Sequence, residues 1–387
     1  MCNSVRLGDI CTKITDGSHN PPQGISCSDY LMLSSKNIYD DDISFDDPRY
    51  LSKENYETEN KRTQISVGDI LLTIVGTIGR VAVVSKTEKK ICLQRSVAVI
   101  KPKQELIDSR FLMYQLQSMR THLEQEARGV AQKGIYLKQV ENLQIKVPSR
   151  DEQLQAVSNL DQISELISLR KQQLAKLDEL VKARFVELFE NSNYPTEPLN
   201  NNVIEMFIGP FGSSLKNEVF VDKENGFCMV YEQKHAIQKT MDVPTRYVPK
   251  SKYEELKRFT ILGGDIIVSC RGTIGEIYTV PDDAPMGIMH PSIMKIRLNT
   301  EKYNQKFFVF ALEQYMDEHN AEAKGSGVKM AVSATVLGQA DFVIPPLEVQ
   351  NHFTTFVEQT DKSKLAIQKS LDELETLKKA LMQKYFG

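Results

Sequence analysis

The sequence predicts an α+β protein: two tandem α+β domains separated by two long antiparallel coiled-coil helices, with an internal pseudo-two-fold repeat. Three observations lead to this fold class. The chain has 387 residues, which is long for one compact domain. Each half holds strand-length runs followed by one helix, and each half ends in about forty residues without Pro or Gly. Strands joined mostly by turns favour an α+β sheet over a doubly wound parallel sheet.

The repeat is visible as motifs that return in the same order. Gly68–Ile70 recurs as Gly264–Ile266, 196 residues further on, and Gly76–Gly79 recurs as Gly272–Gly275 with the same offset. The pairs Val147-Pro148 with Gln153, Arg110-Phe111 and Arg49-Tyr50 also return, as Ile344-Pro345 with Gln350, Lys306-Phe307 and Arg246-Tyr247. Offsets that drift so little over such a length indicate a duplicated chain.

The regular elements follow from periodicity and cap residues. β-branched runs predict strands, and an N-cap Asp108 or Ser109 before an apolar face predicts a helix. The expected strands are 69–75, 80–84 and 96–100 with counterparts 265–269, 276–280 and 293–296, and the expected helices are 108–127 and 304–323. The segment Gly76–Gly79 is expected to form the turn of a hairpin.

The duplication gives the domain boundaries. We expect a first domain at 1–150, a long helix at 151–191, a linker at 192–202, a second domain at 203–345 and a second long helix at 346–387. Each long helix has an apolar seam that needs a partner, and the other helix is the nearest candidate. Packed antiparallel, the pair would resemble a homodimer fused into one chain, with the domains at opposite ends. The seams are interrupted by Arg170, Arg184, Lys364 and Lys378.

Composition excludes several classes of protein. No apolar run reaches the roughly 20 residues needed to span a bilayer, and the N-terminus lacks the pattern of a signal peptide. Six cysteines without a C-x-x-C pair indicate reduced thiols, so we expect a cytoplasmic protein. A net charge of −3 argues against a bulk electrostatic nucleic-acid binder but allows one with localised basic residues.

No set of residues predicts catalysis. Gly76–Gly79 lacks the Gly-Lys-Ser/Thr of a phosphate loop, and the six histidines show no metal-ligand spacing. Asn20-Pro21-Pro22 resembles a methyltransferase motif, but Gln23 stands where the aromatic residue belongs. Asp69 and Asp265 could be nuclease carboxylates, but a turn Asp at the start of a strand is the better interpretation. We therefore expect no catalytic residue and no metal site.

Polar loop segments recur at equivalent places in both halves but differ in identity between them. Their residue types are those that contact base edges and phosphates, although loops are polar in most proteins. The candidate DNA-binding residues are Ser18, His19, Asn20, Ser35, Lys36, Asn37, Thr77, Arg80, Gln94, Arg95, Lys133 and Tyr136 in the first half, and Ser213, Ser214, Lys216, Gln233, Lys234, His235, Arg271, Thr273, His290, Ser292 and Lys329 in the second. Two similar frameworks with different loops suit two different targets.

The ordered set of motifs resembles the DNA-specificity (S) subunit of type I restriction-modification systems over essentially the whole chain. The resemblance rests on the tandem layout, on the Gly-Asp-Ile and Gly-Thr-Ile-Gly pairs, on the Pro-to-Gln entry into each long helix, and on Gly209–Lys216. Departures are Ser149-Arg150 after Pro148, Val349 before Gln350, and a first half without a Pro-Phe-Gly stretch.

The resemblance implies a non-catalytic subunit with two target-recognition domains. Each would read one half of a bipartite asymmetric sequence in double-stranded DNA, with the helix pair as spacer. Two methyltransferase (M) subunits would dock on the helices, and nuclease/translocase (R) subunits would join. The four interruptions of the seam, Arg170, Arg184, Lys364 and Lys378, are candidate contacts for the M subunits, although a solvated or staggered seam is the preferred interpretation of them. S-adenosylmethionine, Mg and ATP would belong to the partners.

Two other classes of function stay open at this point. One is a two-headed coiled-coil scaffold that binds protein partners through its domains. The other is an enzyme, such as a fragment of a fused restriction-methylase, against which the lack of a cofactor loop counts. The salt dependence of binding separates DNA recognition from the scaffold, since DNA binding weakens steeply with salt.

Overall fold

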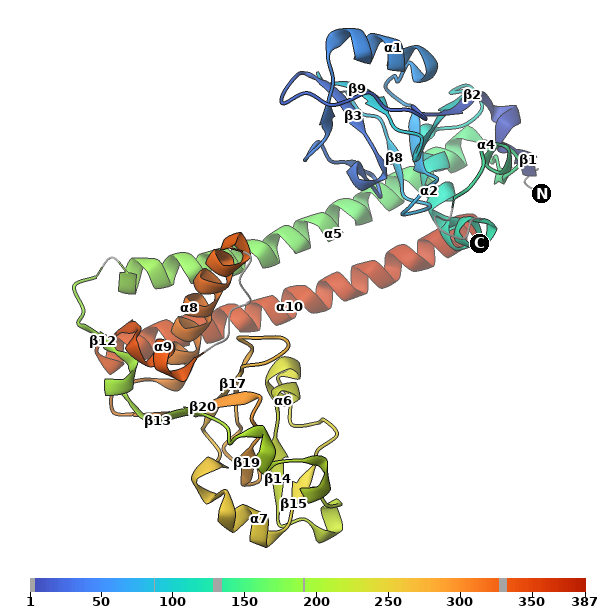
Figure 1. The fold of residues 1–387 in the computed structure, drawn as a ribbon. Coiled ribbons are helices and arrows are strands. Elements are labelled where there is room, and N and C mark those ends of the chain that lie inside the picture. The colour runs from blue at the N-terminus through green and yellow to red at the C-terminus, as the bar shows by residue number, and fades with distance from the viewer. Residues whose placement is uncertain (1–3, 87, 128–133, 191, 327–332) are drawn as a thin grey trace. The chain divides into compact units, whose positions relative to one another are not determined.

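The computed structural model describes residues 4–86, 88–127, 134–190, 192–326 and 333–387, without the side chains of 319–326. The chain divides into two compact units. Unit 1 comprises Met1–Gln173 and Ile367–Gly387, and unit 2 comprises Leu174–Ala366. Each unit therefore combines a globular α+β part with a section of both long helices, α5 and α10 (Figure 1).

Unit 1 contains the first set of elements. Its strands are β1 (Ser4–Arg6), β2 (Cys11–Asp16), β3 (Tyr30–Leu33), β4 (Ile38–Tyr39), β5 (Asp42–Ile43), β6 (Arg49–Tyr50), β7 (Ile70–Thr73), β8 (Val81–Val83), β9 (Lys90–Leu93), β10 (Val97–Pro102) and β11 (Gln144–Lys146). Its α-helices are α1 (Lys53–Thr63), α2 (Ser109–Ser118), α3 (Arg120–Glu126), α4 (Leu137–Glu141) and the first part of α5 (Arg150–Phe185). Short 3-10 helices cover Leu7–Ile10 and Ser35–Asn37.

Unit 2 contains the second set. Its strands are β12 (Thr196–Pro198), β13 (Val203–Ile208), β14 (Cys228–Tyr231), β15 (Tyr247–Val248), β16 (Thr260–Ile261), β17 (Ile266–Ser269), β18 (Ile277–Thr279), β19 (Gly287–Met289), β20 (Ile293–Leu298) and β21 (Asp341–Val343). Its α-helices are α6 (Gln233–Gln238), α7 (Lys250–Glu255), α8 (Gln305–Ser326), α9 (Ala334–Gln339) and the first part of α10 (Leu347–Phe386). Further 3-10 helices cover Leu199–Asn201, Gly212–Ser214, Asn217–Val219, Lys223–Asn225 and Lys257–Phe259.

The two units repeat one sheet topology. The strand order β2-β10-β7-β8 in unit 1 matches β13-β20-β17-β18 in unit 2, and both sheets are antiparallel. A second sheet, β6-β3-β9 in unit 1 and β15-β14-β19-β16 in unit 2, contains one parallel pair in each unit, β3 with β9 and β14 with β19. The two-stranded pairs β1-β11 and β12-β21 complete the match. The predicted α+β class and the internal repeat are therefore confirmed.

The repeated Gly-Thr-Ile-Gly motif forms the turn between the two antiparallel strands β7 and β8, and again between β17 and β18. Gly76 and Gly79 have φ angles of 83° and 82°, and Gly272 and Gly275 have 69° and 87°. These values lie in the left-handed region, which favours glycine because it lacks a Cβ. The hairpin interpretation of this motif is confirmed by the strand pairing.

The aspartates of the Gly-Asp-Ile motif are structural. Asp69 and Asp265 are buried, and each accepts a 2.8 Å hydrogen bond from the backbone N–H three residues upstream. Lys101 forms an ion pair with Asp69, and Arg297 lies 2.7 Å from both carboxylate oxygens of Asp265. A carboxylate held this way closes the turn before β7 or β17, which agrees with the turn interpretation.

In unit 1 the two long helices run antiparallel. Asn159 of α5 donates a 2.7 Å hydrogen bond to the Tyr385 hydroxyl of α10, and Lys171 lies 3.2 Å from Glu375. Phe386 packs with buried residues of α2 and α5, its ring centroid 5.1 Å from that of Phe111. Figure 1 shows this end of α10 beside α2 and the start of α5.

In unit 2 the two long helices pair through aromatic side chains. Phe185 and Phe189, at the end of α5 and in the π-helical turn Val186–Glu190, lie 5.6 and 5.4 Å from Phe353 of α10 between ring centroids. Lys364 of α10 lies 2.6 Å from Asp178 of α5. In both units later residues of α5 pair with earlier residues of α10, so the predicted antiparallel helix pair is confirmed.

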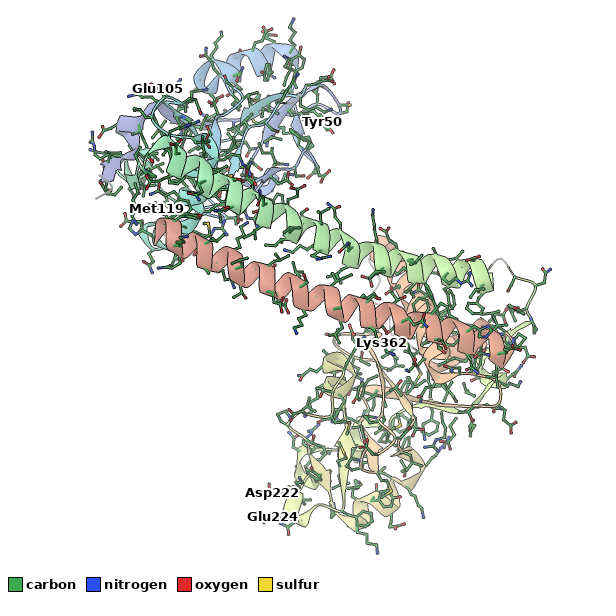
Figure 2. The ribbon with its side chains drawn as sticks, turned by 180° about the vertical axis from the view of Figure 1, so that it is seen from behind. Tyr50, Glu105, Met119, Asp222, Glu224 and Lys362 are labelled. Atoms are coloured by element: carbon green, nitrogen blue, oxygen red, sulfur yellow. The ribbon has the colours of Figure 1, made fainter. Side chains whose placement is uncertain are left out.

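One expected helix needs correction. The predicted helix 108–127 is interrupted at Met119, labelled in Figure 2, between α2 and α3. The Ser118 hydroxyl donates a 2.7 Å hydrogen bond to the Gln115 carbonyl, a local bond that competes with the helical pattern. The expected linker 192–202 contains β12, which pairs with β21, and a buried Leu199, because it repeats the N-terminal strand of unit 1.

A buried glutamine fixes the entry to each long helix. Gln153 accepts a 2.8 Å hydrogen bond from the Asp108 N–H, and its amide donates to the carbonyls of Leu106 and Pro148 at 3.1 and 2.9 Å. Gln350 makes the equivalent three bonds, each 2.8 Å long, to Asn304 N–H and two carbonyls. This geometry explains why Pro and Gln return together in the repeat.

Across the described residues, no helix carries an apolar run long enough to cross a membrane.

The Gln350→Leu variant tests this anchor. Leucine fills similar space but leaves a buried N–H and two carbonyls without partners, so we expect a loss of about 3 kcal/mol in the free energy of unfolding. Urea denaturation measures the loss. The exposed Gln359 on the same helix provides the control, and Gln359→Leu should change stability by about 0.5 kcal/mol or less. Equal losses in both variants would contradict the anchor.

Candidate nucleic-acid interface

In unit 1, five loop segments meet at one end of the two sheets. The Arg95 N–H donates to the Ser18 carbonyl at 2.9 Å, which joins the loop after β2 to the turn before β10. The Ser35 N–H donates to the Ser96 hydroxyl at 3.1 Å, and the Ile74 N–H donates to the Ser96 carbonyl at 2.9 Å. We define the loop surface of unit 1 as residues 17–20, 34–37, 74–80, 94–96 and 134–136.

A concave pocket of about 470 Å³ opens on this surface. Three predicted site residues line it: His19, Arg95 and Tyr136. Tyr136 is 68% exposed, which is unusual for an aromatic side chain and leaves its ring free to contact a ligand. The sequence predicted these residues on separate loops, and the fold places them around one pocket.

A carboxylate in the lining of the pocket is contacted from two sides. Asp16 is buried, lies 2.8 Å from His19 Nε2, and forms an ion pair with Arg62 of α1. Arg62 also donates to the Asp16 carbonyl at 3.1 Å. Arg62 was not among the predicted site residues, because nothing in the sequence indicates that α1 lies against the end of β2.

Three predicted residues of unit 1 are engaged within the protein. Asn37 is buried, and its amide donates to the Asp46 carbonyl at 2.9 Å. Lys36 forms an ion pair with Asp47, and the Arg80 guanidinium lies 4.9 Å from the Tyr39 ring centroid. The Asn37 side chain therefore holds its loop in place.

The other predicted residues of unit 1 lie at the surface or outside the described residues. Asn20, Thr77 and Arg95 are exposed, and Ser18, Ser35 and Gln94 are half-buried. Lys133 lies outside the described residues. The loop Pro21-Pro22 is fixed by Arg49, whose Nη1 donates to both carbonyls at 3.3 and 2.8 Å.

Unit 2 gathers its loops in the same way. The His290 N–H donates to the Tyr231 carbonyl at 2.8 Å, the Cys270 N–H to the Ser292 carbonyl at 2.8 Å, and the Gly209 N–H to the Ile293 carbonyl at 3.0 Å. We define the loop surface of unit 2 as residues 209–216, 232–235, 270–276 and 290–292. The same framework thus carries two surfaces with different side chains.

An ion cluster occupies the loop surface of unit 2. Glu232 is buried, forms an ion pair with Arg246, and lies 2.8 Å from Lys234. The Arg246 guanidinium also lies 3.9 Å from the Phe220 ring centroid, so it fixes the loop after β13 much as Arg49 fixes the loop after β2. The sequence analysis did not list Arg246 as a site residue, although the repeated Arg-Tyr pair pointed to it.

The two histidines of this surface are held inside the fold. His235 is fully buried, and its Nδ1 accepts a 3.0 Å hydrogen bond from the Glu232 N–H. His290 Nδ1 lies 2.8 Å from the Ser292 hydroxyl. Burial lowers the pKa of both imidazoles, which therefore stay neutral near pH 7.

The remaining predicted residues of unit 2 are mostly exposed. Ser213, Lys216, Arg271 and Thr273 are exposed, Ser214 and Gln233 are half-buried, and Lys329 lies outside the described residues. Phe211, which belongs to the Gly209–Lys216 stretch but was not among the predicted DNA-binding residues, is 88% exposed. Within the described ranges, no three His, Cys, Asp or Glu side chains gather closely enough to hold a metal ion.

The four interruptions of the helix seam differ in their surroundings. Arg170 and Arg184 bond to side chains three residues further on, Gln173 at 2.8 Å and Glu187 at 2.7 Å. Lys364 and Lys378 each line a cleft beside α5 and α10. The cleft of unit 2, about 610 Å³, contains Lys364, and the cleft of unit 1, about 710 Å³, contains Lys378.

These two clefts differ in charge. In unit 1 the basic residues prevail, and the charged lining is Arg120, Lys171, Lys378 and Lys379 with Asp40 and Glu375. In unit 2 the acidic residues prevail, and the charged lining is Asp178, Glu276, Glu313, Asp317 and Asp361 with Lys182, Lys239 and Lys364. Burial lowers the pKa of Lys378, whose Nζ lies 5.9 Å from the Tyr114 ring centroid.

Comparison with known proteins gives one consistent result. Residues 2–179 and 213–377 match the type I restriction modification DNA specificity domain. The chain is 33% identical to the type I restriction enzyme EcoBI specificity subunit of Escherichia coli over 158 residues, which are 39% of this chain and 33% of that protein. It is 21% identical to the putative type I restriction enzyme MjaX specificity subunit of Methanocaldococcus jannaschii over 355 residues, 86% of this chain and 82% of that protein.

Solved structures show the same fold. The S subunit of a type I restriction-modification system from M. genitalium has a TM-score of 0.55 at 15% identity, and the match covers 100% of this chain and 96% of that chain. A chain from a study of complex assembly and conformational transition of the type I R-M system has a TM-score of 0.61 at 15% identity, covering 99% and 97%. With the family match spanning most of both halves, the chain belongs to the DNA specificity subunits of type I restriction-modification systems, which bind DNA and are not themselves catalytic.

Proposed function

We propose that the loop surface of each unit reads one half of a bipartite, asymmetric sequence in double-stranded DNA. One observation carries the proposal: the same sheet framework presents a loop surface in both units, while the side chains on it differ. A framework that is repeated while its loops diverge is suited to two different half-sites. Exposed arginine, lysine, asparagine and serine side chains are the types that contact bases and phosphates.

Matched positions show how far the surfaces differ. Gln94 and Arg95 of unit 1 correspond to His290 and Pro291 of unit 2, whereas the next residue is serine in both. The backbone carbonyl of this serine accepts a hydrogen bond from the loop after the preceding strand. Ser96 accepts it from the Ile74 N–H after β7, and Ser292 accepts it from the Cys270 N–H after β17. The residue that holds the framework is therefore kept, and its two neighbours in the loop are replaced.

We further propose that α5 and α10 act as the spacer between the half-sites and as the docking site for partners. The family assembles with other subunits, and the expected partners are two methyltransferase (M) subunits and nuclease/translocase (R) subunits in the cytoplasm. S-adenosylmethionine, Mg and ATP are assigned to those partners. We assign docking to the charged clefts containing Lys364 and Lys378, because each cleft combines a long helix with the adjoining domain.

A two-headed scaffold for protein partners is the alternative. Both functions could use the two loop surfaces, but the affinity for DNA depends more steeply on salt than the affinity for a protein partner. Release of counterions from DNA makes the logarithm of the affinity fall linearly with the logarithm of the salt concentration.

Exchanging the first domain tests the assignment of half-sites. Residues 1–150 are replaced by the corresponding segment of another family member, and the methylated sequence is mapped in cells that contain the partner subunits. We expect one half of the motif to change and the other half to stay the same, because unit 2 is untouched. The proposal is wrong if both halves of the motif stay unchanged.

Shortening the helix pair tests the spacer. Deleting 171–177 from α5 and 368–374 from α10 removes one heptad from each helix and preserves the phase of the seam. The loss of about 10 Å of helix should shorten the gap between half-sites by about three base pairs. Methylation mapping measures the gap, and an unchanged gap in an active variant would rule out the spacer role.

The Lys378→Glu variant tests docking in the cleft of unit 1. Reversing a half-buried charge should weaken binding of the methyltransferase subunit roughly tenfold, about 1.4 kcal/mol. Titration calorimetry with the purified partner measures the change. Lys369→Glu, on an exposed face of the same helix, is the control and should bind normally. Equal affinities for the two variants would exclude Lys378 from the interface.

A further inference from the structure

Two arginines differ from all the others in the described part of the chain. The guanidinium groups of Arg95 and Arg271 are exposed and have no hydrogen-bond, ion-pair or ring partner there. Every other described arginine is engaged: Arg6, Arg49, Arg62, Arg80, Arg110, Arg120, Arg150, Arg170, Arg184, Arg246, Arg258 and Arg297. One unpaired arginine therefore stands on the loop surface of each unit.

The backbone beneath each of these arginines is fixed. The Arg95 N–H donates to the Ser18 carbonyl at 2.9 Å, in the turn between β9 and β10. Arg271 follows Cys270, whose N–H donates to the Ser292 carbonyl at 2.8 Å, at the start of the β17–β18 hairpin. A free guanidinium on a fixed backbone is arranged to form new hydrogen bonds with little rearrangement of the chain.

The two arginines are not equivalent in the repeat. The position matching Arg95 in unit 2 is Pro291, and the position matching Arg271 in unit 1 is Val75. Each arginine therefore projects from a different loop of the common framework. A base contacted by Arg95 would lie at a different place in its half-site from a base contacted by Arg271.

Guanine is the base that this chemistry favours. The planar fork of arginine donates two hydrogen bonds to O6 and N7 of guanine in the major groove, the commonest specific contact between a side chain and a base. Carboxylates close to either arginine are already neutralised, Asp16 by Arg62 and Glu232 by Arg246 and Lys234. Neither free guanidinium is thus needed for charge balance within the fold.

We propose that Arg95 and Arg271 are specificity-determining residues that each read a guanine, one in each half-site and at non-equivalent positions. This inference rests on the proposed function, since it takes the loop surfaces to be the DNA-reading surfaces. It adds the base that each surface recognises. A half-site made only of A·T pairs is incompatible with it.

The experiment uses the complex assembled with its methyltransferase subunits and duplexes carrying the mapped motif. Each guanine in turn, on either strand, is replaced by 7-deazaguanine, which lacks the N7 acceptor. At one guanine in each half-site, we expect the replacement to weaken binding by the wild-type complex roughly tenfold to hundredfold. In the Arg95→Gln complex the same replacement in its half-site should have no further effect, and Arg271→Gln should behave likewise in the other half-site.

Arg6→Gln is the matched control, because Arg6 is paired with Asp9 away from the loop surface and its loss should leave the effect of 7-deazaguanine unchanged. If the wild-type complex tolerates 7-deazaguanine at every position, the proposal is overturned without need of a variant. It is also overturned if Arg95→Gln weakens binding equally on all sequences, since that outcome marks a phosphate contact. The exchange of residues 1–150 distinguishes failure of this inference from failure of the proposed function. If the exchange alters the methylated motif but 7-deazaguanine is tolerated, only the guanine assignment is wrong.

Discussion

The three hydrogen bonds of a buried glutamine determine how each domain joins its long helix. Gln153 ties the first turn of α5 to the N-terminus of α2 and to the segment before the helix, and Gln350 does the same for α10 and α8. The start of each long helix is thereby fixed against the equivalent helix of its own domain, α2 for α5 and α8 for α10. A buried amide with all its groups satisfied stabilises one arrangement over its alternatives, because any other leaves polar groups without partners.

The long helices also belong to the cores of the domains. The start of α5 and the end of α10 contribute Leu160 and Phe386 to the core of unit 1, while Phe185 and Phe353 contribute to the core of unit 2. Neither helix needs to be stable by itself, because its apolar seam is buried against a domain at each end. Helix pairing and domain folding are therefore coupled within each unit.

The sequence predicts those parts of the structure that are governed by local patterns. The long helices, the hairpin at Gly76–Gly79 and its counterpart, and the N-cap Asp108 follow from periodicity, from glycine at positive φ and from capping. The second sheet was not predicted, because its strands have only two to four residues and carry too little periodicity to be recognised. Arg62 and Arg246 were missed as site residues for a related reason: their roles depend on contacts between segments distant in sequence.

Divergence between the two loop surfaces is constrained by the hydrogen bonds that hold the loops. Ser96 and Ser292 use backbone groups to anchor the loop after β7 or β17, so neighbouring side chains can change without loss of the frame. Arg95 can be replaced by proline at the matching position, and Val75 by arginine, while the strand order stays the same. A duplicated frame of this kind allows each half to change its outward-facing residues independently. Under the proposed function, divergence of the side chains alone would give each half its own DNA half-site.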